Sequence, residues 1–129
     1  MTATLRAVDP EQLASSPAFA QGMIAPAGAT LYVGGQNGAD ASGALLDGLE
    51  AQTTQALRNV IAVLEEAGTD VHHVAKLTIY LAPSVDPNGA YAASAAVWTA
   101  RTAVTVLAVA PARDGALVEI EAIAVVPQG

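Results

Sequence analysis

The stretch LEAQTTQALRNVIAVLEEAG, residues 49–68, followed by VAKLTIYL, residues 74–81, decides the fold class of this chain. In the first segment, apolar side chains recur at helical spacing on one face. This apolar set is Leu49, Ala56, Leu57, Val60, Ile61 and Leu64, and the outer face carries Gln52, Gln55, Arg58, Asn59 and Glu65. Gly68 stands where a glycine commonly ends a helix. The second segment is rich in β-branched and aromatic residues, which favours a strand. We therefore expect a helix over 49–67 and a strand over 74–81.

Three short strands are expected before this helix, over residues 5–8, 21–25 and 31–34. The last two are separated by Pro26-Ala27-Gly28, which is typical of a hairpin. A glycine-rich loop over 36–48 then leads into the helix.

A second helix over 88–97 and two strands, 101–109 and 116–126, are expected after residue 81. Pro87 lies near the first turn of that helix, where proline is tolerated. The element order is β-β-β-α-β-α-β-β, in a single domain over 1–129. It predicts a two-layer α+β fold, a mixed sheet with two helices on one face. The other sheet face then needs cover, which a neighbouring subunit could supply.

The composition excludes several classes of function. The chain lacks cysteine, so disulfides and thiolate chemistry are excluded. The net charge of −7 argues against nucleic acid and an anionic membrane as partners, because binding to phosphates relies on lysine and arginine. No apolar run approaches the roughly 20 residues that cross a bilayer. The N-terminus lacks the apolar core of a secretory signal, so we expect a cytoplasmic protein.

Arg101 is the first candidate for a functional side chain, because it opens the apolar stretch RTAVTVL. A guanidinium can hold a carboxylate through two parallel hydrogen bonds. An arginine at a strand end can equally well reach solvent, and the residue alone leaves both interpretations open.

Glu119 is the second candidate, in the strand LVEIEAIAVV. Strand alternation places Glu119 and Glu121 on one face, which is either solvated or a site. A partly buried carboxylate there could act as a general acid or base. If the last two strands pair as a hairpin, this stretch lies roughly opposite Arg101. The register then decides which glutamate is nearer.

Two weaker signals remain. Gly34 and Gly35 end a strand at a point where a ligand could approach the backbone closely. His72 and His73 do not predict a metal site, because adjacent strand residues point to opposite faces and the chain has no further histidine or cysteine.

Taken together, these segments resemble the Rid (YjgF) family of reactive-intermediate deaminases. The specific part is ARTAVTV, residues 100–106, followed by VEIEAIAV, residues 118–125. LYVGGQ at 31–36, the first helix and the strand over 74–81 also resemble family segments, so the resemblance covers nearly the whole chain.

The resemblance implies a chorismate-mutase-like fold and a homotrimer with ligand sites between subunits. It implies hydrolysis of enamines and imines, such as 2-aminoacrylate, to 2-keto acids and ammonia, without a metal or organic cofactor. Arg101 falls on the family's carboxylate-binding arginine, and Glu119 on the glutamate that handles the attacking water. Gly35 falls on the glycine that ends the family's Ser-Gly-Gln strand.

The chain departs from the family pattern at several substrate-binding positions. Gly34 replaces the family serine, Phe19 matches a position that is often tyrosine, and Ala103 occupies the small or thiol position. Asn88 matches a family asparagine, although its spacing to Arg101 is shorter. Two alternatives to a deaminase stay open at this point: a non-catalytic trimer that binds small carboxylates, and a ribonuclease, against which the acidic charge argues.

Overall fold

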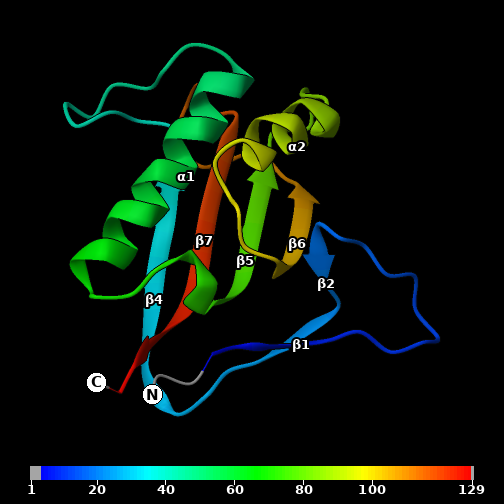
Figure 1. The fold of residues 1–129 in the computed structure, drawn as a ribbon. Coiled ribbons are helices and arrows are strands. Elements are labelled where there is room, and N and C mark those ends of the chain that lie inside the picture. The colour runs from blue at the N-terminus through cyan, green and yellow to red at the C-terminus, as the bar shows by residue number, and fades with distance from the viewer. Residues whose placement is uncertain (1–3, 129) are drawn as a thin grey trace.

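The computed structural model describes residues 4–128, which form one five-stranded mixed sheet, a separate two-stranded sheet and two helices (Figure 1). The small sheet pairs β1 (Arg6–Val8) with β3 (Gly22–Ile24). The main sheet has the strand order β2-β6-β5-β7-β4. Its strands are β2 (Phe19–Ala20), β4 (Gly28–Asn37), β5 (Val74–Leu81), β6 (Thr102–Ala108) and β7 (Val118–Pro127). The α+β class predicted from the sequence is confirmed.

Helix α1 (Leu49–Glu66) is the main cover of the sheet. Its side chains Leu57, Val60 and Leu64 are buried against strand residues that include Leu77 and Ile120. Each such side chain contributes about 1.5–3 kcal/mol when it leaves water completely. Figure 1 shows α2 (Pro87–Ala95) on the same side of the sheet as α1. The two-layer arrangement is therefore the predicted one.

One residue of α1 differs from the expected pattern. Gln52 was assigned to the outer face of the helix, but it is buried. Its amide nitrogen donates to the carbonyls of Leu46 and Gly115, and its side-chain oxygen accepts from the backbone N–H of Leu117. These bonds satisfy the polar group, so it can be buried at little cost.

The two hairpins expected from the sequence do not form. β3 pairs with β1, and β4 pairs with β7 instead. Likewise β6 does not pair with β7, because β5 lies between them. The reason is the helix between β5 and β6: a strand-helix-strand unit returns the chain in the same direction, so β6 pairs parallel with β5. β7 then pairs antiparallel on the other side of β5.

Residues 4–128 leave the sheet face opposite the helices uncovered. It carries Tyr32, which is 74% exposed, and the exposed Ile123. Tyr32 and Ile123 lie opposite each other, and Tyr80, Glu119 and Glu121 on the same face are half-buried. A face with both apolar and charged side chains is either an association surface or part of a site. Within residues 4–128, no helix is long and apolar enough to span a membrane.

Candidate functional site

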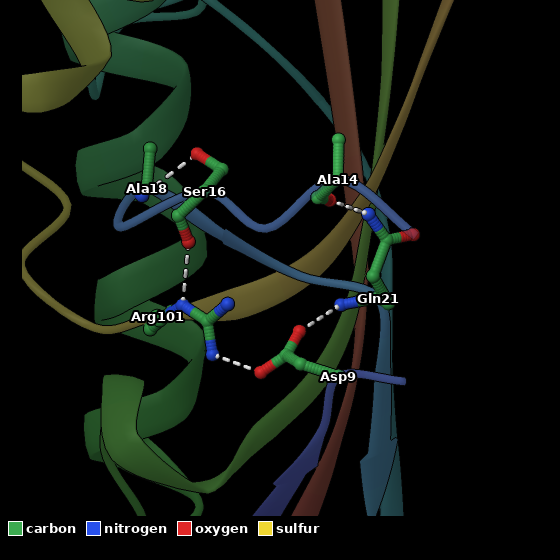
Figure 2. A network of polar contacts seen from close by, with 6 residues as sticks. All are labelled: Asp9, Ala14, Ser16, Ala18, Gln21 and Arg101. Atoms are coloured by element: carbon green, nitrogen blue, oxygen red, sulfur yellow. Dashed lines mark hydrogen bonds and ion pairs between the residues drawn. The ribbon is translucent and has the colours of Figure 1, made fainter. Parts of the chain in front are cut away.

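Arg101 lies directly before β6, and its guanidinium is held by the N-terminal segment of the chain (Figure 2). Its Nε donates to the carbonyl oxygen of Ser16 at 2.9 Å, and its Nη1 donates to Oδ2 of Asp9 at 2.6 Å. The side chain keeps 31% of its surface exposed. Arg101 is therefore neither freely solvated nor buried, and it already binds one carboxylate.

The contact with Arg101 changes the charge behaviour of Asp9. The hydrogen bond from Arg101, together with the backbone N–H of Gln21, lowers the pKa of Asp9 from its ordinary value of 3.8. Because the folded-state pKa is the lower one, the stabilisation is complete above pH 3.8 and is lost as the pH falls through the lowered value. At neutral pH the ion pair is therefore fully charged.

Phe19 and Asn88 lie around two neighbouring cavities on the helix side of β6. One, of about 200 Å³, is lined by Phe19, Tyr91, Trp98 and Arg101. The other, of about 240 Å³, is lined by Phe19, Asn88 and Tyr91 together with aliphatic side chains. Three of the chain's five aromatic side chains thus surround the cavity beside the guanidinium. The space beside Arg101 therefore combines aromatic side chains with polar ones such as Ser94 and Thr102.

Glu119 belongs to a second group of residues, at the opposite end of the sheet. Gly34 and Gly35 form a bulge in β4, where the register with β7 shifts between Val33 and Gln36. Glu119 lies directly over this bulge, so that a Cβ on Gly35 would overlap its Oε2 and lie 2.9 Å from its Cδ. A Cβ on Gly34 would meet no atom within 4 Å. A side chain at 35 would therefore displace the Glu119 carboxylate, whereas one at 34 would not.

Two side chains that the sequence did not single out distinguish the two glutamates. The amide nitrogen of Asn37 donates to Oε1 of Glu119 at 3.3 Å. The hydroxyl of Tyr80 donates to Oε1 of Glu121 at 2.5 Å, and this bond raises the pKa of Tyr80. Glu121 thus has a short hydrogen bond to Tyr80, whereas the contact of Glu119 with Asn37 is long. Glu119 is the carboxylate better placed to hold a water.

Arg101 and Glu119 are far apart within one chain. Glu119 lies opposite Tyr80 on β5, and Tyr80 lies opposite Leu107 on β6. Arg101 precedes Leu107 by six residues, which corresponds to about 20 Å along a strand. The expectation that the two lie opposite each other in a hairpin was wrong, because β5 intervenes. Ala103 lies near the Arg101 end of the sheet, opposite Lys76.

The histidines lie in a short 3-10 helix, Val71–His73, and not in a strand. Nδ1 of His73 contacts Oδ1 of Asp70 at 2.8 Å. Among the described residues there is no group of three or more histidine, cysteine, aspartate or glutamate side chains that could hold a metal ion.

The fold and these two residue groups define a small α+β domain with one helix-covered sheet face and one open face. The family model described as Endoribonuclease L-PSP matches residues 10–126. The chain belongs to this family, which includes the Rid (YjgF) proteins.

Relatives and solved structures agree with this assignment. YyfB of Yersinia pestis, a Rid family protein of unknown function, is 31% identical with a TM-score of 0.85, and the match covers 95% of this chain and 99% of that one. RidA of an Antarctic Psychrobacter is 29% identical with a TM-score of 0.71, over 87% of this chain and 91% of that one. A RutC family protein of Aquifex aeolicus is 40% identical over 52 residues, so the match spans 40% of this chain and 42% of that protein.

Proposed function

We propose that the protein is a cytoplasmic deaminase that hydrolyses reactive 2-imino and 2-enamino acids, such as 2-aminoacrylate, to 2-keto acids and ammonia. The observation that carries the proposal is the position of Glu119, a half-buried carboxylate over the Gly34-Gly35 bulge on an uncovered sheet face. Membership of the Rid family supports it. The family name also contains "endoribonuclease", but the chain's net charge of −7 disfavours RNA as substrate.

The proposed chemistry needs only groups that the chain contains. Arg101 binds the carboxylate of the imino acid. Glu119 takes a proton from water as the water oxygen bonds to the imine carbon, and it returns that proton to the nitrogen. In the resulting carbinolamine, Glu119 carries the hydroxyl proton to the nitrogen. The C=O bond forms as the C–N bond breaks, and ammonia leaves a 2-keto acid. Holding water and imine together supplies much of the acceleration. No cofactor takes part in this scheme.

Since Arg101 and Glu119 are about 20 Å apart along the strands of one chain, the proposed site forms between subunits. A second copy placed on the uncovered sheet face would bring its Arg101 group toward the Glu119 group of the first. Substrate-binding residues then come from both copies: Gly34 and Gly35 from one side, and Phe19, Asn88 and Ala103 from the other. The direct test of the function is the release of keto acid from freshly generated 2-aminoacrylate.

The first prediction concerns the assembly. We expect light scattering to give three times the 12.9 kDa chain mass, because association covers the sheet face that carries Tyr32 and Ile123. A monomer mass at micromolar concentration would contradict the trimer and, with it, the shared site.

The second prediction compares the two glycines of the bulge. Gly35→Ala forces the Glu119 carboxylate away from its position, so we expect keto-acid release to fall by at least about tenfold. The fold should survive, because the displaced atoms are the end of a flexible side chain. Gly34→Ser is the matched control: its Cβ has room, and activity should be retained. Equal activity of both variants in the same assay would rule out this placement of Glu119.

A further inference from the structure

The Arg101 guanidinium is partly occupied before any ligand arrives. Asp9 and Ser16 come from the segment that precedes β2, and Asp9 lies 92 positions from Arg101 in the sequence. Figure 2 shows both groups directed at the guanidinium from this segment. The same carboxylate also accepts the backbone N–H of Gln21 through Oδ1 at 2.9 Å. Asp9 lies at the start of the segment 9–18 and Gln21 lies beyond its end. Asp9 therefore links Arg101 to both ends of this segment.

The geometry of an arginine limits what a ligand can do with these bonds in place. A carboxylate can bind a guanidinium through two hydrogen bonds in two ways, either to both Nη atoms or to Nε and one Nη. In this chain Nη1 is bonded to Asp9 and Nε to Ser16. Two of the five guanidinium N–H donors are thus engaged, and a ligand carboxylate that binds both Nη atoms has to share Nη1 with Asp9. The Ser16 partner is a backbone carbonyl, whereas the Asp9 partner is a side chain.

Asp9 is also the chemical equivalent of the group that a ligand would bring. Its carboxylate has the charge and shape of the carboxylate of a 2-keto or 2-imino acid, and two like charges on one guanidinium repel each other. The pair is accessible to a ligand, because Asp9 is 25% exposed and Arg101 31% exposed. The exposure also means that the ion pair is weak enough to be exchanged.

We infer that Asp9 is an internal competitor for Arg101, which the carboxylate of the ligand must displace in order to bind both Nη atoms without a like charge beside it. This inference rests on the proposed role of Arg101. Only the fraction of molecules in which Asp9 has left the guanidinium binds ligand fully, so Asp9 raises the apparent Kd by the inverse of that fraction. Asp9 is then a residue that sets affinity and favours ligands with a full carboxylate over amides or esters.

The test uses isothermal titration of the full chain with 2-ketobutyrate. Asp9→Asn keeps the shape and the acceptor for the Gln21 N–H but removes the charge, so the fold should be kept. We expect the Kd to fall by roughly twofold to fivefold, the range of an exposed ion pair. Glu11→Gln is the matched control, because Glu11 is exposed in the same loop and its loss changes the net charge equally. This control should leave the Kd unchanged.

A second measurement needs no variant. In the unmodified chain, 2-ketobutyrate should speed hydrogen exchange of the Gln21 amide, since displaced Asp9 no longer accepts from it. Weaker or unchanged binding by Asp9→Asn, or no effect on the Gln21 amide, would overturn the inference that Asp9 competes with the ligand. If Arg101→Ala still abolishes binding in that case, the proposed carboxylate site stands. If Arg101→Ala binds as the unmodified chain does, the carboxylate site itself is wrong, and the competitor falls with it.

Discussion

Arg101→Ala is expected to lower kcat/KM for imine hydrolysis, and affinity for 2-ketobutyrate, by at least about tenfold. A charge-assisted hydrogen bond contributes on the order of 1.5–3 kcal/mol, and about 1.4 kcal/mol corresponds to a factor of ten. Arg101→Lys should recover only part of the loss, because an ammonium cannot form the planar two-bond contact. Keto-acid release and calorimetric titration measure the two effects.

The fold should survive both changes. The Arg101 contacts with Asp9 and Ser16 are partly exposed, and exposed ion pairs contribute little to stability. Arg58→Ala is a suitable control, since Arg58 is exposed on α1 and its loss changes the net charge equally. If Arg101→Ala turns over imines as fast as the unmodified chain, the arginine is only an anchor for the N-terminal segment.

The elements that the sequence predicted well are those in which local pattern and burial agree. The strand over 74–81 has the predicted bounds, and α1 ends one residue before the prediction. In α1 the helical apolar period matches the face that packs in the core, and in the strand the β-branched and aromatic residues match its place in the sheet. β2 was missed because two residues, Phe19 and Ala20, carry no periodicity at all.

Strand pairing was harder to predict than strand position. Neighbouring strands in sequence suggested hairpins, whereas the crossover through α2 fixes β6 beside β5. The error has a functional consequence, because the hairpin would have brought Arg101 and Glu119 together in one chain. The partners of Arg101 were also beyond sequence reasoning, since Asp9 is brought to it only by the tertiary fold. The position of Tyr80 could have been predicted from the sequence, because alternation along the strand 74–81 places it on the open face.

Glu119→Gln is expected to abolish most turnover while ligand binding is retained. The amide keeps the shape of the side chain and can still accept from Asn37, but it cannot take a proton from water. Removing a general acid or base costs about 10²–10⁴-fold, so we expect kcat to fall by at least about a hundredfold. The Kd for 2-ketobutyrate should change little, since the proposed carboxylate contact belongs to Arg101.

Glu121→Gln is the matched control for this change. Glu121 lies two residues further along the same face, and its Oε1 accepts from Tyr80, a role that the glutamine oxygen can keep. Turnover should therefore remain within roughly a few-fold of the unmodified chain, because the substitution preserves the hydrogen bond from Tyr80. The opposite pattern, loss in Glu121→Gln and none in Glu119→Gln, would assign the proton transfer to Glu121 and contradict the proposed role of Glu119. If the unmodified chain binds 2-ketobutyrate but releases no keto acid from 2-aminoacrylate above the spontaneous rate, the protein is a carboxylate-binding member of its family, because Arg101 suffices for binding and only hydrolysis requires Glu119.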